Sequence, residues 1–229
     1  MLDEKLYVTD SHGAFISVEK RKEILPKLRE CSYLHGDAGS AVMCVYLLLL
    51  TSKGELRLVQ RSGDKKENPD LLDKSVGGHV SAVCPFDQKY MQQIFDMTLR
   101  RECAEEIGLD EILMLKDNDF VEFIKNKEHC YEQYALITQL EHDPWYASLR
   151  TVKNGKAWIK RHNVAIYMGV FDGEFEFRDA EALVEKSIDL NDIDLSTFEN
   201  NELYTKDLQQ LIKKYLPRFK SLWPIKSKS

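Results

Sequence analysis

Short apolar runs separated by turn residues predict most of the strands in this chain. The longest run, residues 41–50, has ten residues, which fits a buried strand and is too short to cross a bilayer. We predict a central strand over 41–51, joined by turn residues to a partner at 55–61. The other predicted strands form a hairpin within residues 1–20 and single strands at 131–138 and 164–171.

Apolar residues at helical spacing predict helices at 19–31, at about 87–107 and at 204–215. Asp87 is the expected N-cap of the second helix, and Gly108 is its expected end. Residues 109–125 fit either a short helix or an irregular strand.

Polar stretches predict the connections between these elements. We expect a loop at 62–73 and a polar, aromatic-containing connection at 141–162 that turns at Asn154-Gly155. A turn at 172–173 is expected to lead into a short returning strand at 174–177. The tail from Pro217 is basic and is expected to fray.

The length and charge of the chain limit its class. Its 229 residues, 43% of them hydrophobic, are enough for one large domain with appendages. We divide it into an N-terminal extension (1–36), a main domain (37–216) and a basic C-terminal tail (217–229). The net charge of −6 argues against a general nucleic-acid-binding surface, although a nucleotide substrate remains compatible with it.

The cysteines and the N-terminus predict a reduced, cytoplasmic protein without a membrane partner. There are five cysteines and no CxxC pair, so a disulfide framework or a zinc site is not expected. The charged first residues are followed by no long apolar region, so no signal peptide is evident.

Three carboxylates stand out on the predicted second helix. Glu102, Glu105 and Glu106 are three and four residues apart, which places them on one face, where like charges repel. A hard divalent cation such as Mg²⁺ or Mn²⁺ would make that arrangement favourable. The alternative is a solvated acidic helix face, which is common.

The surrounding residues resemble the Nudix box, whose pattern is G-x5-E-x7-R-E-U-x-E-E-x-G-U, with U apolar. Residues 101–109 match its second half position by position, and Gly77-Gly78 matches its opening glycine. Two departures are visible. Gln93 stands where the family has its first Glu, and residues 81–90 are an insertion that lengthens the loop before the helix.

The resemblance implies an α/β (α+β) Nudix fold, in which a mixed sheet lies between helices, here with a short N-terminal hairpin extension. It also implies a metal-dependent hydrolase that cleaves the diphosphate linkage of a nucleoside diphosphate joined to another group, X. The metal, Mg²⁺ or Mn²⁺, would be held by Glu102, Glu105, Glu106 and the backbone carbonyl of Gly78. Arg101 would support the box by pairing with an acid.

The general base is open. Glu106 is the first choice within the box, and Glu181 and Glu185 are distal candidates that are more simply explained as exposed acids. We count Glu105, Glu106 and Arg101 as the catalytic residues.

Other residues are candidates for substrate binding, each with a plainer explanation. Arg61 and Lys74 could meet phosphates or be solvated cations, and His79 could be a ligand or a structural histidine. The aromatic residues Trp145, Tyr146 and Trp158 could stack on a base, although burial in a core is commoner. Cys103 fills an apolar box position and is expected to be buried.

Two other functions compete with hydrolysis. The N-terminal region loosely resembles the branch of isopentenyl diphosphate isomerases, whose catalytic cysteine would fall at Gly77 and whose paired glutamates would fall near residues 161–163; neither is present. A non-catalytic nucleotide-sensing module is favoured by Gln93 and the insertion. The identity of X stays open, and family dimers suggest a possible homodimer.

Overall fold

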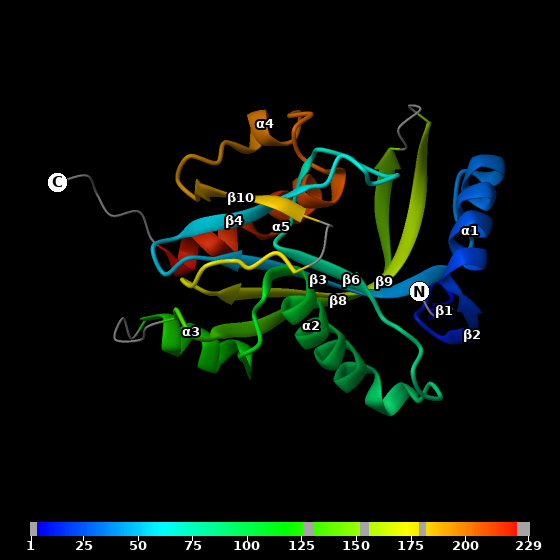
Figure 1. Ribbon diagram of the computed structural model, residues 1–229, viewed down its shortest axis with the longest axis horizontal. Helices are drawn as coiled ribbons and strands as arrows, with labels where there is room; N and C mark the ends of the chain where they lie inside the picture. The colour runs from blue at the N-terminus through cyan, green and yellow to red at the C-terminus, as the bar shows by residue number, and fades with distance from the viewer. Residues whose placement is uncertain (1–3, 126–130, 152–155, 179–181, 224–229) are drawn as a thin grey trace.

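One mixed sheet runs through the centre of the molecule. The computed structural model describes residues 4–125, 131–151, 156–178 and 182–223, shown in Figure 1. The sheet has the order β10-β4-β3-β9-β8-β7, with β1 and β6 also paired to β3, and β5 to β4. These strands are β1 (Lys5–Thr9), β3 (Ala41–Leu50), β4 (Glu55–Arg61), β5 (Leu72–Asp73), β6 (Val76–His79), β7 (Ile112–Leu115), β8 (Ala135–Thr151), β9 (Ala157–Val170) and β10 (Ala182–Asp189).

The central strand β3 explains why the sheet is covered on both sides. All ten of its residues are buried, and it pairs in parallel with β9 over its whole length. Because successive side chains on a strand point to opposite faces, its residues divide between two cores. Tyr46 and Leu48 belong to one core, and Val45 and Leu47 to the other.

Each core is closed by a helix. The helix α2 (Met91–Ile107) packs on the Val45 side, and α5 (Lys206–Leu222) on the Tyr46 side, so the sheet lies between them (Figure 1). This confirms the predicted arrangement of a mixed sheet between helices. Among the described residues, no helix has both the length and the apolar character needed to cross a membrane.

The N-terminal hairpin joins the central sheet. It consists of β1 and β2 (Phe15–Lys20), as predicted, and β1 also pairs with β3. The next helix, α1 (Arg21–His35), buries Ile24 and Leu28 in a small third core that includes Trp158. The extension is therefore continuous with the sheet, and α1 stands at one end of it (Figure 1).

The prediction of a polar connection at 141–162 is wrong. Strands β8 and β9 form a long antiparallel hairpin through this region, and its predicted turn at 154–155 lies outside the described residues. The register shifts between Gln139 and Glu141 and again between Asp143 and Tyr146, where Pro144 cannot donate to the ladder. The far part of the hairpin therefore stands away from the main sheet, toward α1 (Figure 1).

Several smaller expectations need correction. The predicted strand at 174–177 is not formed, while residues 109–125 contain both a strand, β7, and a helix, α3 (Asp117–Lys125). The tail does not fray at Pro217, because α5 continues to Leu222 and buries Leu216 and Phe219. A short helix, α4 (Leu195–Phe198), precedes α5. The domain division at residues 36 and 216 stays a prediction.

Candidate active site

The helix α2 presents its carboxylates because its other side is apolar. Phe95, Leu99, Cys103 and Ile107 recur at helical spacing and are buried against the sheet. Cys103 is thus buried as predicted, and burial raises the pKa of its thiol. Gly108 ends the helix at φ 70°, a conformation that glycine adopts without steric cost, and the Leu109 amide donates to the Cys103 carbonyl.

The insertion before α2 leads into the predicted cap. Asp87 accepts a hydrogen bond from the Lys89 amide at the start of a 3-10 turn, η1 (Gln88–Tyr90), which continues directly into α2. Within the insertion, Phe86 stacks on Phe15 of the N-terminal hairpin at 5.0 Å between ring centroids. The lengthened loop is therefore packed against the extension.

The glycine turn on β6 meets the acidic face of α2. A Cβ on Gly78 would lie 1.9 Å from Cδ of Glu102, so only a glycine leaves room for this carboxylate. The Gly77 amide donates to Oε2 of Glu106 at 3.2 Å. Gly77 and Glu106, which are 29 residues apart in sequence, thus bring together the two halves of the box.

Arg101 holds the same junction from the helix side. It pairs with Glu102, with Glu105 (2.6 Å), and donates to the carbonyl of His79 at 3.1 Å. Although partial burial opposes its charge, the two glutamates raise the pKa of Arg101. The predicted role of Arg101, pairing with an acid of the box, agrees with these contacts.

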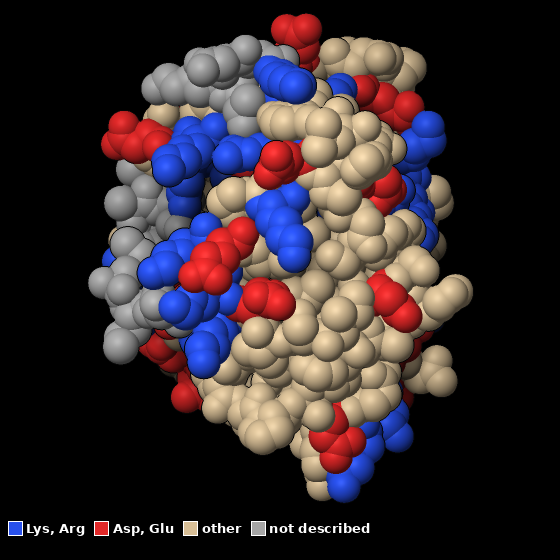
Figure 2. Space-filling view, turned by 90° about the vertical axis from the view of Figure 1, so that its right-hand side faces the viewer, with Lys and Arg blue, Asp and Glu red and all other residues tan. Residues whose placement is uncertain are grey.

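The box opens into a cavity of about 950 Å³. Glu102, Glu105 and Glu106 lie on one wall with Gly77 and Gly78. Basic side chains dominate the remaining lining: Arg21, Lys22, Arg29, Arg61, Lys65, Lys66, Lys74, Arg101, Arg150 and Lys160. Figure 2 shows the end of the molecule that carries α1, where Lys and Arg side chains gather on one side with a few carboxylates among them.

Two histidines and a lysine lie at the inner end of this cavity. Nζ of Lys160 is 2.8 Å from Nε2 of His79, and the rings of His79 and His162 are 6.1 Å apart. Burial, followed by repulsion from Arg150, lowers the pKa of Lys160 to about 7. Burial and the neighbouring Lys160 also lower the pKa of both histidines, so they are neutral at pH 7.

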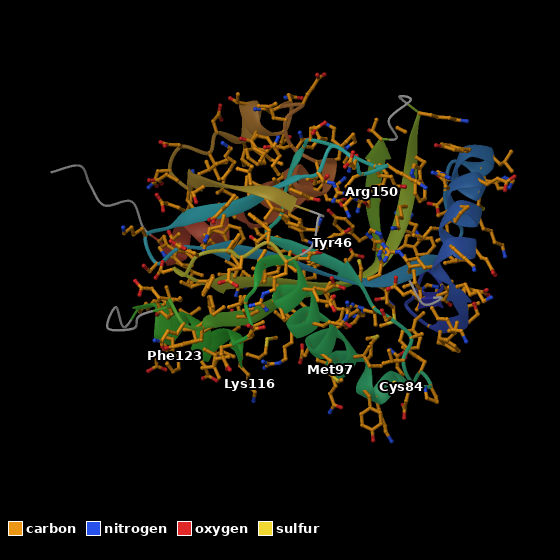
Figure 3. All side chains as sticks on the ribbon, viewed as in Figure 1. Tyr46, Cys84, Met97, Lys116, Phe123 and Arg150 are labelled. Carbon is orange, nitrogen blue, oxygen red and sulfur yellow. The ribbon has the colours of Figure 1, made fainter. Side chains whose placement is uncertain are left out.

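A buried network continues from the histidines to α5. The hydroxyl of Tyr46 is 2.6 Å from Nδ1 of His162, and Arg150 pairs with Asp207 at 2.7 Å. Figure 3 shows Tyr46 and Arg150 close together beside the raised hairpin. Nε2 of His162 and Nε of Arg150 are buried without a hydrogen-bond partner among the described residues. Both residues line the cavity, so each has a nitrogen atom there that can still form a hydrogen bond.

The structure places the other predicted binding residues at the cavity but also gives them internal partners. Lys74 is buried and pairs with Asp73 at 3.1 Å, with its ammonium 4.1 Å from the centre of the Tyr46 ring. Arg61 pairs with Asp73 at 3.2 Å and donates to the carbonyls of Glu67 and Asn68. Neither is a simple solvated cation.

Several candidates do not reach the cavity among the described residues. Trp145, Tyr146 and Trp158 are absent from its lining, and the latter two are buried in cores. Glu185 forms a bidentate ion pair with the buried Arg57, at 2.6 and 2.9 Å. This pair gives Glu185 a structural role. Glu181 lies outside the described residues.

Sequence reasoning missed Arg150, Lys160 and His162. The signal was present in the alternation of β9, where Trp158, Lys160 and His162 are buried and the residues between them are less so. The basic residues of α1 were also missed, because nothing in a local helical pattern shows that it will lie opposite the box.

The donor set suits a hard divalent cation. Three carboxylates and a glycine carbonyl supply only oxygen, and the space above Gly78 is kept open for Glu102. Among the described residues, no group of three or more His, Cys, Asp or Glu side chains is placed to hold a metal ion. Arg101 pairs with Glu102 and Glu105 and would compete with a cation for them.

Several solved structures align with this chain. DR0079 from Deinococcus radiodurans aligns with a TM-score of 0.58 at 17% identity, over 92% of this chain and 98% of its own. A Nudix hydrolase from Alicyclobacillus acidocaldarius aligns at 0.49 and 15% identity, over 76% of this chain and 90% of its own. A MutT protein from Methanosarcina mazei aligns at 0.42 and 15% identity, over 79% and 94% of the two chains.

Sequence comparisons add no assignment. No protein-family model matches the chain, and no match was found among curated proteins. At these identities a structural likeness shows the fold. The mixed sheet between helices agrees with that likeness, and the chain shares the fold of DR0079.

Proposed function

We propose that this protein is a metal-dependent hydrolase that cleaves the diphosphate linkage of a nucleoside diphosphate joined to another group, X. The observation that carries the proposal is the meeting of Gly77 and Gly78 with Glu102 and Glu106 at the wall of a large basic cavity. The carboxylates suit a cation, and the basic walls suit phosphate groups.

Glu102, Glu105, Glu106 and the Gly78 carbonyl would hold Mg²⁺, or Mn²⁺ as second choice. A bound divalent cation supplies charge stabilisation for phosphate oxygens and acidifies water. The chain's own residues do the rest. Arg101 orients Glu102 and Glu105, and the Gly77 amide orients Glu106 through Oε2.

Glu106 is the best-placed general base. It lines the cavity, whereas Glu185 is held by Arg57. Lys74 and Arg61 face the cavity with internal carboxylate partners, which fixes their positions before a substrate arrives. His79 contributes its carbonyl to Arg101 and its ring to Lys160, so we assign it a positioning role beside the substrate.

The test is a phosphate-release assay over a panel of nucleoside diphosphate derivatives, with Mg²⁺ and then Mn²⁺, in which a coupled phosphatase releases inorganic phosphate from the phosphate monoester products. We expect a metal-dependent hit that Glu105→Gln and Glu106→Gln each reduce by about 100-fold or more, because each removes an oxygen ligand. Glu122→Gln, which changes an exposed acid on α3, is the matched control and keeps full activity. Unchanged turnover in both box variants would show that the metal assignment is wrong.

Two alternatives are outcomes of the same experiment. Tight nucleotide binding without turnover would favour a sensing module, for which Gln93 and the packed insertion would then be the relevant departures. Isomerisation of an isoprenoid diphosphate is disfavoured, because Gly77 replaces the nucleophile and His162 and Asn163 stand where carboxylates are needed. A cytoplasmic homodimer with no nucleic-acid partner remains our expectation for the assembly.

A further inference from the structure

The cavity is basic in a protein that is acidic as a whole. Ten Lys and Arg residues line it against five glutamates, three of them in the box. The whole chain carries a net charge of −6. Cations gathered in a concave surface attract anions more strongly than the same cations spread over a convex one.

Much of this positive charge is already paired with carboxylates of the protein itself. Arg61 and Lys74 pair with Asp73, and Arg150 pairs with Asp207. Arg21 likewise pairs with Glu4 at 2.7 Å. These four cations share three carboxylates, so most of their charge is balanced within the protein.

Three basic side chains at the cavity form no ion pair or hydrogen bond with a carboxylate among the described residues. They are Arg29 on α1, Lys66 on the loop after β4, and Lys160 on β9. Within the described part of the chain, the side chain of Lys160 is hydrogen-bonded to the neutral His79, and Nε2 of the nearby His162 has no hydrogen-bond partner. The three residues come from separate elements, so the fold has brought them to one cavity.

The loop that carries Lys66 is held in place. The Asn68 amide donates to the Thr151 carbonyl at 3.0 Å, and the Thr151 amide donates to Oδ1 of Asn68 at the same distance. Asn68 adopts a φ of 49°, and Arg61 donates to its carbonyl. A loop fixed in this way costs little ordering entropy when it binds a ligand.

We propose that Arg29, Lys66 and Lys160 form a second anion subsite, which binds a phosphate group of the substrate other than the two phosphates joined by the cleaved bond. The substrate class is therefore a polyanion: a nucleoside diphosphate derivative whose X group carries its own phosphate. This assignment of X rests on the proposed hydrolase function. The anion subsite itself can be tested without it.

The test compares two metal-free probes, inorganic pyrophosphate and inorganic tetrapolyphosphate, by calorimetry in the presence of a chelator. We expect the full-length protein to bind tetrapolyphosphate at least about tenfold more tightly, because the longer anion reaches more cations. The double variant Arg29→Ala/Lys66→Ala should lose about tenfold in tetrapolyphosphate affinity and little in pyrophosphate affinity.

The matched control is Lys27→Ala/Lys53→Ala, which removes two exposed cations outside the cavity, one of them also on α1, and should bind as the parent does. Equal affinity of the parent for the two probes, or an unchanged double variant, would overturn the subsite. A preserved binding difference together with no turnover in the panel would instead overturn the hydrolase and leave the subsite standing.

Discussion

Gly78 is the residue on which the geometry of the box depends most directly. Its missing side chain leaves the place that the Glu102 carboxylate fills, and Glu102 is itself only 8% exposed. The atom that a new Cβ would displace is the end of a movable side chain, not backbone. A substitution here therefore moves a ligand before it disturbs the fold.

We expect Gly78→Ala to lower kcat/KM by about 10- to 100-fold while the midpoint of thermal unfolding changes little. The cause is displacement of the Glu102 carboxylate, which would lie 2.1 Å from the new methyl group through Oε1. Kinetics at saturating Mg²⁺ and a melting curve measure the two effects. Full activity in this variant would show that Glu102 does not act from its present position.

Asp73 makes the stability of the protein depend on pH through its contacts with the basic residues of the cavity. Burial alone would raise the pKa of Asp73, but Lys74, Arg61, Arg150 and the Thr205 hydroxyl together lower it below its usual value. A lowered carboxyl pKa stabilises the native state fully above about pH 4, where the unfolded carboxyl is ionised. That stabilisation is lost as the pH falls toward the native pKa.

Asp73→Asn should lower the free energy of unfolding at pH 7 by about 3–5 kcal/mol, because it removes the carboxylate of Arg61 and leaves the buried Lys74 only Asp207, at 3.9 Å. Its stability should also fall less steeply than that of the parent below about pH 4. Urea unfolding at several pH values measures both. The exposed Asp192→Asn is the control, and an Asp73→Asn curve parallel to that of the parent would contradict the linkage.

At the scale of elements, the local sequence was sufficient to predict a helix or strand whose apolar pattern lies within a single segment. The apolar spacing of α2, its Asp87 cap and Gly108 predicted the box helix, and the apolar run of β3 predicted the central strand. The β8–β9 hairpin was missed because two register shifts and Pro144 interrupt its alternation. The three residues of the proposed anion subsite were missed because only tertiary packing brings them to one cavity.

The end of α5 was underestimated for a related reason. Pro217 has no amide hydrogen, which predicts a break, but burial of Leu216 and Phe219 outweighs one lost hydrogen bond. Phe219→Ala should therefore lower the free energy of unfolding by about 3–5 kcal/mol. Chemical denaturation measures the change, with the exposed Gln210→Ala as control on the same helix. A loss below about 1 kcal/mol would mean that the helix end frays after all.

At the scale of the whole molecule, the contrast between the basic cavity and the acidic exterior governs how an anion arrives. Substrate is attracted to the cavity and repelled elsewhere, and salt screens both effects. We expect KM for the substrate found in the panel to rise several-fold between about 0.05 and 0.5 M NaCl at constant free Mg²⁺, with a smaller change in kcat.

The same salt series on Arg29→Ala/Lys66→Ala provides the comparison. Its KM should start higher and depend less on salt, because two of the attracting charges are gone. A KM that does not respond to salt in the parent would show that the cavity charges are fully compensated by their internal carboxylates.

The bend near the register shift at Pro144 also sets the direction of the raised part of the β8–β9 hairpin (Figure 1). Beyond that bend the hairpin carries Arg150 and Lys160, whereas the box lies on other elements. Side chains alternate along a strand, so this part can lengthen or shorten only by residue pairs, in steps of about 6.5 Å. Adding or removing one residue pair here would therefore move Arg150 and Lys160 relative to the box without altering the residues of the box.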